Sequence, residues 1–251
     1  MAYISFQPND YFNTKIYTGT GSSNALTGVG FQPDWTWIKR RNATASHAIQ
    51  DAVRGNDKSL RSNTTGAEYT NTFFSSFDTD GFTVTSSESD VNASAETYAS
   101  WNWKANGSGS SNTDGTTSST VSVNTTAGFS IVKWTGSGSA TTIGHGIGVT
   151  PKIIMLKNTS EVYGWQVYHA SLGNTKYLAL DSTDAEATSS ESWNNTSPTS
   201  TVFSVGASDS NNKSGNTIIA YCFAEKKGFS KFGSYVGNGS TWGTFVNCGF
   251  K

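Results

Sequence analysis

One pattern occurs twice in this chain, first as Gly28-Val29-Gly30-Phe31-Gln32-Pro33-Asp34-Trp35-Thr36-Trp37-Ile38-Lys39. The second occurrence is Gly146-Ile147-Gly148-Val149-Thr150-Pro151-Lys152-Ile153-Ile154-Met155-Leu156-Lys157, with the glycines, the proline and the final lysine in the same places. Proline has no amide hydrogen to give to a central ladder, so it belongs at the start of a strand or on an edge. Both copies therefore predict a glycine-rich turn that leads through Pro33 or Pro151 into a buried strand.

The motifs on either side of this pattern also repeat in the same order. The motif Gly-x-Gly-Ser recurs at corresponding places, which begin at Gly19, Gly136 and Gly237, and the last of these lies in a partial copy that opens at Gly233 and ends at Gly249-Phe250-Lys251. Repetition on this scale is typical of repeat architectures. It predicts an internal duplication with these parts: a lead-in at 1–14, repeat one at 15–105, a linker rich in Gly, Ser, Thr and Asn at 106–126, repeat two at 127–232, and a partial third repeat at 233–251.

The composition favours strands over helices. Only 14% of the 251 residues are charged, against a typical quarter, and Gly, Ser, Thr and Asn are abundant while eight Trp, fourteen Phe and ten Tyr supply apolar surface. Small polar residues compete with the helical backbone for hydrogen bonds and suit tight turns. We expect an all-β protein of two tandem antiparallel β-sandwich domains, jelly-roll or lectin-like, plus the start of a third copy. A short helix over Ser46–Val53 is the one helical stretch that the spacing of apolar residues allows.

Charge and cysteine content restrict the partners that we expect. The formal net charge is −1, so no electrostatic attraction to nucleic acid is expected, and no stretch approaches the ~20 apolar residues of a membrane span. Cys222 lies in an apolar run and is expected to be a buried free thiol. The first residues lack the basic and apolar stretches of a secretory signal. We expect synthesis in the cytoplasm without a signal peptide.

The sequence predicts no catalytic, cofactor-binding or metal-binding residues. His47, His145 and His169 are far apart and have no metal-ligand spacing. The acidic residues lie in turns rather than in apolar strands, where a carboxyl group with a raised pKa would be expected. The Gly-x-Gly motifs lack the helix that phosphate binding requires. We therefore expect a protein that is not an enzyme.

The tryptophans fall into two groups. Four of them are replaced in repeat two by Ile153, Met155, Tyr221 and Phe223, and interchange among apolar residues indicates core packing; these are Trp35, Trp37, Trp101 and Trp103. Three have no matched partner and are the candidates for surface contact, for example with a sugar: Trp165, Trp193 and Trp242.

Several segments resemble one known family. Phe12-Asn13-Thr14-Lys15-Ile16-Tyr17-Thr18-Gly19, Gly28–Asp34 with Trp37-Ile38-Lys39, and Ala220-Tyr221-Cys222-Phe223-Ala224-Glu225-Lys226-Lys227-Gly228-Phe229 are similar to repeat-bearing virion proteins of marine tailed bacteriophages. The resemblance implies a structural, tail-fibre-like component of the virion exterior and supplies no catalytic residues. Members of that family continue the third repeat past its proline, so this chain is expected to be a fragment or a short member.

Three functions remain open on this basis. The first is a tail fibre or appendage, a homo-oligomer and most simply a trimer, which binds other virion proteins and meets the host surface, where a glycan is a candidate partner. The second is a capsid decoration or head-fibre protein bound to the phage shell, which the sequence does not separate from the first. The third is a polysaccharide-degrading enzyme of the virion, against which duplication without a cluster of acids or nucleophiles argues. In each case residues 233–251 are expected to be ordered only by pairing with something else.

Overall fold

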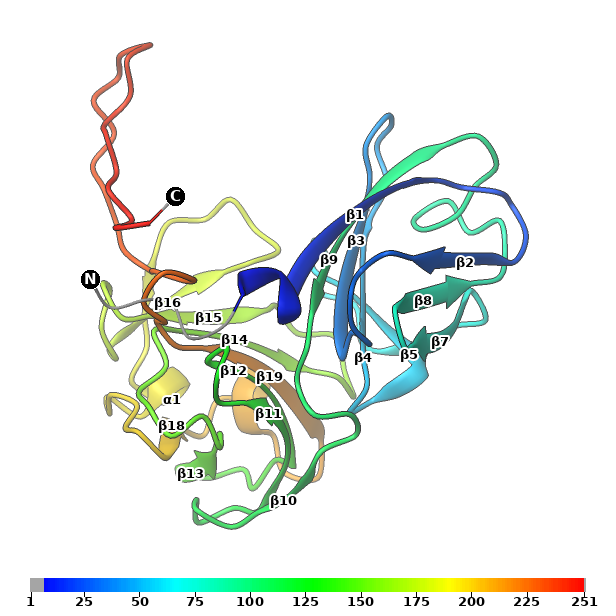
Figure 1. Ribbon diagram of the computed structural model, residues 1–251. Helices are drawn as coiled ribbons and strands as arrows, with labels where there is room; N and C mark the ends of the chain where they lie inside the picture. Colours follow the sequence, from blue (N-terminus) through cyan, green and yellow to red (C-terminus); the bar gives the residue numbers. More distant parts are fainter. Residues whose placement is uncertain (1–6, 251) are drawn as a thin grey trace.

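The computed structural model describes residues 7–250, and its regular secondary structure is almost entirely antiparallel strand (Figure 1). The first half of the chain begins with the 3-10 helix η1 (Pro8–Asp10). Its strands are β1 (Phe12–Thr18), β2 (Asn24–Thr27), β3 (Trp35–Arg40), β4 (His47–Asp51), β5 (Gly55–Arg61), β6 (Tyr69–Thr70), β7 (Phe74–Asp78), β8 (Gly81–Val84) and β9 (Thr97–Trp103).

The second half contains the remaining strands and two single-turn helices. They are β10 (Ser110–Asn112), β11 (Ser119–Asn124), β12 (Phe129–Thr135), β13 (Thr141–Gly144), β14 (Ile153–Asn158), β15 (Gln166–His169), β16 (Lys176–Ala179), β17 (Ala187–Thr188), α1 (Ser190–Trp193), β18 (Val202–Val205), α2 (Asp209–Asn212) and β19 (Thr217–Phe223).

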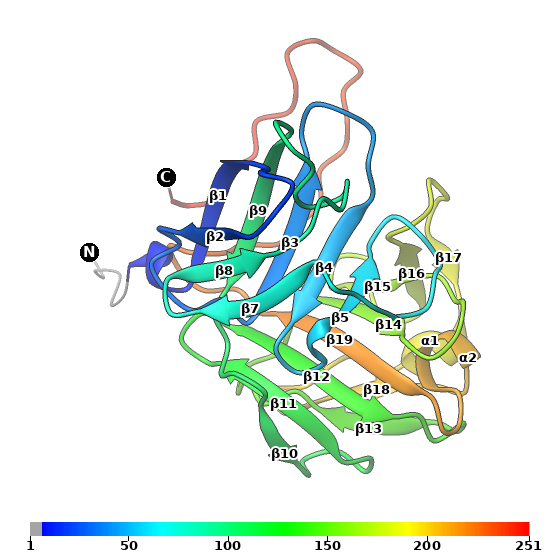
Figure 2. The ribbon, with the colours of Figure 1, turned by 90° about the vertical axis from the view of Figure 1, so that its right-hand side faces the viewer.

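The two halves have the same strand order. The large sheet of the first half runs β1-β9-β3-β4-β5-β6, and that of the second half contains the corresponding run β12-β19-β14-β15-β16-β17. A smaller sheet covers each one: β2-β8-β7 in the first half, where Figure 2 shows it in front of the large sheet, and β13-β18 in the second. The all-β sandwich fold expected from the sequence is therefore present, and the shared order supports the inferred duplication.

Equivalent turns are also held by equivalent hydrogen bonds. The buried Asn92 side chain accepts from the amide of Thr20 (3.1 Å) and donates to the carbonyl of Ser22 (2.7 Å). In the second half the side chain of Asn212 makes the same two bonds, since it accepts from the amide of Ser137 (3.0 Å) and donates to the carbonyl of Ser139 (2.6 Å). A Cβ at Gly19 would collide with the carbonyl oxygen of Ala93. These contacts explain why the Gly-x-Gly motif is kept in both halves.

The repeated segments 28–39 and 146–157 form the glycine-rich turn and the buried strand that their sequences predict. Both of its first two glycines have positive φ in each copy, 83° and 91° at Gly28 and Gly30 and 69° and 80° at Gly146 and Gly148, a region that L side chains rarely adopt. The proline is buried and lies two residues before β3 and β14. None of the residues that follow it in Trp35–Ile38 and Ile153–Leu156 is exposed. The equivalence of Pro33 and Pro151 is confirmed.

Each large sheet is covered on one face by its small sheet and on part of the other face by the other half. Because successive side chains on a strand point to opposite faces, Ile38 of β3 packs under the small sheet of its own half, whereas Trp35 packs toward the other half. Likewise Ala220 of β19 faces β13 and β18, and Tyr221 faces the first half. A third core therefore lies between the two large sheets, whose strands run in clearly different directions (Figure 2).

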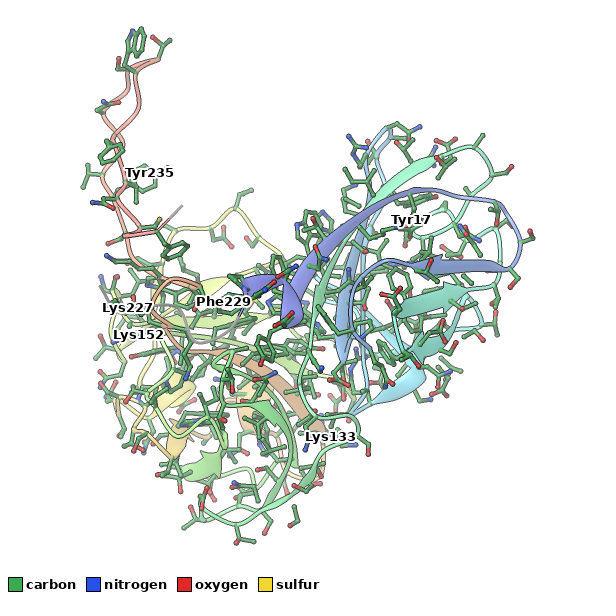
Figure 3. The ribbon with its side chains drawn as sticks, in the orientation of Figure 1. Tyr17, Lys133, Lys152, Lys227, Phe229 and Tyr235 are labelled. Atoms are coloured by element: carbon green, nitrogen blue, oxygen red, sulfur yellow. The ribbon has the colours of Figure 1, made fainter. Side chains whose placement is uncertain are left out.

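A buried ion pair fixes the two halves against each other. The side chain of Arg54 is 2% exposed and that of Asp51 is 0% exposed, and Arg54 Nε donates to Asp51 Oδ2. The hydroxyl of Tyr221, from the second half, donates to the same carboxylate oxygen at 2.7 Å. Arg54 also contacts Glu68 at 3.2 Å. At the margin of this contact, Lys133, labelled in Figure 3, donates to a carbonyl of the first half at 2.8 Å.

Three expectations from the sequence are wrong in detail. Residues 106–126, expected to be a linker, form β10 and β11, because the alternation of Val121 and Val123 with polar residues is a strand pattern within a low-complexity composition. Residues 8–14 of the expected lead-in form η1 and the start of β1, while 1–6 lie outside the described residues. The stretch Ser46–Val53 contains the strand β4, not a helix. Ala48 and Ile49 are both buried there because each faces a different core.

Candidate functional site

Of the three tryptophans expected at the surface, two are buried. Trp165 is 1% exposed, because it packs in the core between the two large sheets, where its Nε1 donates to Arg61 O at 3.0 Å. Trp193 is also 1% exposed and packs edge-on against Tyr168, with ring centroids 5.6 Å apart. The surface role expected for these two residues is wrong. Trp242 is 86% exposed, in agreement with expectation, although its role in binding remains a prediction.

The tryptophans expected in the core instead form a candidate binding site. Trp35 is fully buried, but Trp37, Trp101 and Trp103 are only half-buried. Together with His47 these three indoles line a cavity of about 280 Å³, which we call the aromatic pocket. All four side chains lie on one face of the first large sheet, since cross-strand register pairs Trp37 with Trp101 and places His47 opposite Lys39. The second half covers the neighbouring part of this face and leaves the pocket open.

Hydrogen bonding fixes the chemistry of His47. The indole nitrogen Nε1 of Trp37 donates to His47 Nδ1 at 3.0 Å, so the neutral imidazole carries its proton on Nε2. Burial, followed by the nearby charge of Lys39, lowers the pKa of His47, while Asp90 acts against this. The pKa of an unperturbed histidine is already near 6.5. His47 is therefore a neutral donor at pH 7.

The walls of the pocket are set at an angle to each other. The rings of Trp37 and Trp101 have centroids 6.5 Å apart and planes at 72°, and those of Trp37 and His47 are 6.0 Å apart at 63°. Trp103 continues the aromatic surface toward the shared core, where its ring lies 4.3 Å from that of Trp35. The pocket thus rests on rigid sheet residues rather than on loops, which favours a preformed site.

The other two histidines have structural places. His145 is buried, with its Nδ1 accepting from the amide of Ile147 at 3.2 Å, and burial lowers its pKa. His169 ends β15, where its Nδ1 accepts from the amide of Ser171 at 3.1 Å. Within residues 7–250 no group of three or more His, Cys, Asp or Glu side chains is arranged to hold a metal ion.

A second exposed apolar feature lies at the C-terminal side of the chain. Nine large hydrophobic side chains are exposed among residues 7–250, and six of them lie on residues 233–250, which we call the arm: Tyr235, Val236, Trp242, Phe245, Val246 and Phe250. Figure 1 shows the arm running out and back, away from both sandwiches, and Figure 3 labels Tyr235 on it.

The arm is held mainly by local bonds. It contains no strand, and Thr244 Oγ1 donates to Val236 O at 3.0 Å and Asn238 Nδ2 to Trp242 O at 2.8 Å. In each half the corresponding Gly-x-Gly turn is fixed by a buried asparagine, but the described part of the chain provides no such partner for Gly237 and Gly239. The arm therefore presents apolar side chains and backbone groups that further contacts would satisfy.

Comparison with known proteins shows the family of the chain. Residues 7–251 match the family described as a domain of unknown function (DUF7483), and the chain belongs to this family. No curated protein and no solved structure matches it. Among the described residues, no helix has the length and apolar character needed to cross a membrane.

Tryptophans 37 and 101 were missed as site residues because their repeat partners, Met155 and Tyr221, are apolar. The available signal was the Trp-x-Trp pattern on two strands, which places two indoles on one face of each strand. The pattern does not tell which of those faces the second half covers, because this depends on long-range packing between the halves.

Proposed function

We propose that this chain is a non-enzymatic structural protein of a bacteriophage virion exterior, of the tail-fibre or appendage type, which displays its β-sandwiches toward the host surface. The segments that resemble virion proteins support this proposal, and the arm is the observation that carries it. A protein that assembles with other subunits needs an exposed apolar surface whose burial stabilises the assembly. Six of the nine exposed large hydrophobic side chains of residues 7–250 gather on this one segment.

The geometry of the arm indicates how it contributes to assembly. Burying apolar side chains contributes about 25 cal/mol per Å², and Trp242 and Phe245 expose 86% and 87% of their surface. Extended chain with free backbone groups also pairs readily with an exposed sheet edge. The strand β1 is such an edge, because among residues 7–250 only β9 is paired with it, whereas its counterpart β12 lies between β11 and β19. The arm is suited to association with other copies, as a trimer or another homo-oligomer, and with other virion proteins.

The role of the arm is tested by measuring oligomeric state with light scattering after size-exclusion chromatography and by sedimentation. A variant with Tyr235→Ser, Trp242→Ser and Phe245→Ser is expected to dissociate at a concentration at least about tenfold higher than the unmodified protein. The control replaces two exposed hydrophobic residues by serine, Val149 and Val162, which lie outside both the arm and β1, and it is expected to keep the original assembly. Equal effects of the two variants, or a monomeric unmodified protein, would contradict the role of the arm.

The location is tested on particles of the phage that encodes the chain. Antibody-gold labelling of intact virions is expected at tail appendages. Labelling confined to the capsid shell would replace the tail-fibre assignment by a capsid decoration protein. Absence of the chain from purified particles would refute the virion proposal as a whole.

A further inference from the structure

The geometry points to the aromatic pocket as a binding site for one pyranose ring of a host-surface glycan, with Trp101 as the stacking wall and His47 as a hydrogen-bond donor. This inference rests on the proposed function, since it supplies the contact through which an exterior virion protein would meet its host. It assigns a site that the sequence alone placed in the core.

The first step of the argument is the chemistry of the lining. In the described part of the chain the pocket is lined by three indoles and one imidazole, without a carboxylate or an ammonium group in its wall. The wall itself therefore offers no charged group to a ligand, and the ammonium group of Lys39, opposite His47 in the sheet, already donates to Ala45 O at 3.0 Å. A pyranose ring has an apolar face of C–H groups that packs on an aromatic ring, together with hydroxyl groups around its edge. Its two kinds of surface match a pocket that is apolar over most of its area.

The second step is the supply of donors. His47 Nε2 and the indole nitrogens of Trp101 and Trp103 make no hydrogen bond within residues 7–250, and none of the three belongs to the buried polar atoms left unpaired. Each of these nitrogen atoms therefore keeps some accessible surface that the described residues do not cover. The proton on His47 Nε2 is fixed there by the bond from Trp37 to the other ring nitrogen. Hydroxyl oxygens of a sugar are the acceptors that such N–H groups require.

The third step is size and rigidity. A volume of about 280 Å³ lies just below the range for pockets that hold drug-sized ligands, roughly 300–1,000 Å³, and suits one sugar unit rather than a larger molecule. Trp37 and Trp101 belong to the neighbouring strands β3 and β9, which are paired in register. The angle of 72° between their planes lets one ring stack on the sugar face while the other bounds its edge.

The test uses the unmodified protein labelled with ¹⁵N in its tryptophan indoles. Methyl glycosides of glucose, galactose, mannose, rhamnose and N-acetylglucosamine, and oligosaccharides released from bacterial lipopolysaccharide, are titrated in turn. At least one is expected to shift the indole N–H signals of Trp37, Trp101 and Trp103 in a saturable way while that of Trp242 stays unchanged. Absence of such shifts with every sugar overturns the inference, and so do shifts that depend on protein concentration alone, which would make the pocket an interface between copies.

A matched pair of variants locates the binding. Trp101→Ala is expected to weaken binding of the best sugar about tenfold or more, and Trp242→Ala, which removes an exposed indole of the arm, is expected to leave it unchanged. Equal losses in both variants overturn the assignment of the pocket. Circular dichroism checks that Trp101→Ala is folded, and should it not fold, the shifts in the unmodified protein decide. Assembly and virion labelling are measured without sugar, so failure of the pocket leaves the structural role standing, and the reverse also holds.

Discussion

Replacing Arg54 by methionine tests whether the buried ion pair fixes the two halves to each other. Arg54→Met keeps the length of the side chain but leaves the Asp51 carboxylate, 0% exposed, without its cation. Asp51 would retain the Tyr221 hydroxyl at 2.7 Å and the backbone amides of residues 53 and 54 at 3.1 and 2.9 Å. Removing one partner of a buried ion pair costs about 3–5 kcal/mol, and because these three donors remain, we expect the lower end, about 3 kcal/mol.

The matched control is Arg40→Met, which breaks a more accessible pair. The side chains of Arg40 and Glu96 are 16% and 28% exposed, and exposed pairs contribute about 0.2–1 kcal/mol. For a domain of this size 1 kcal/mol corresponds to about 2–4 °C in Tm. We therefore expect Arg54→Met to lower Tm by about 6–12 °C and Arg40→Met by no more than about 4 °C.

Urea unfolding, followed by tryptophan fluorescence and far-ultraviolet circular dichroism, measures the two changes. Coincident transitions by both methods would show that the halves unfold together, as a shared core requires. Equal destabilisation by the two substitutions would refute the argument that burial makes the Arg54 pair important. Two separate transitions in the unmodified protein would refute the coupling of the halves.

Three further predictions concern single buried groups. Cys222 is fully buried, and burial raises the pKa of its thiol, so Ellman's reagent is expected to modify only the exposed Cys248 in native protein and both thiols in denaturant; two fast thiols in native protein would contradict this. Burial lowers the pKa of the Lys157 ammonium from 10.5 to about 8. Between these values Lys157 binds more protons in the unfolded state, so its own contribution to the free energy of unfolding rises from pH 8 to 10.5, whereas the raised pKa of Cys222 acts in the opposite direction. Lys157→Met should therefore make the pH slope of the free energy of unfolding less positive than that of the unmodified protein in parallel urea titrations; identical pH slopes would refute it. Asn212→Ala removes buried hydrogen bonds to the Gly-x-Gly turn and should cost about 1–3 kcal/mol in urea unfolding, whereas an unchanged midpoint would show that the turn holds without it.

The fold class was predictable because its causes are local. A glycine with positive φ and a proline at the entry to a strand restrict the backbone wherever they occur, so Gly28, Gly30 and Pro33 mark the same turn and strand in both copies. Short strands separated by small polar residues then leave an antiparallel sandwich as the packing solution. These are properties of neighbouring residues, and the sequence states them directly.

The candidate site was not predictable in the same way, because burial here depends on contacts between the halves. The neighbouring residues Ala48 and Ile49 are both apolar, because different cores cover the two faces of β4. Two adjacent apolar residues of this kind also fit the spacing of an amphipathic helix, which is why a helix was expected here. Trp165 has no repeat partner of its own kind, yet it is buried because it packs in the core between the halves, where its Nε1 also donates to Arg61 O. Repeat comparison shows which positions vary, but only tertiary packing determines which of them meet water.

The aromatic pocket is open and the contact between the halves is buried because equivalent positions of the two repeats carry different residues. Lys39 Nζ donates to Ala45 O at 3.0 Å, and Lys157 Nζ donates in the same way to Tyr163 O at 2.7 Å, so the two turns correspond at a shift of 118 residues. By that correspondence His47 occupies in the first half the position that Trp165 occupies in the second. Trp165 is used to bind the halves together, whereas His47 stays at the margin of their contact, beside indoles that the second half does not cover. Two similar sheets packed face to face thus give one shared core and one uncovered aromatic surface, and the uncovered surface is where a ligand can bind.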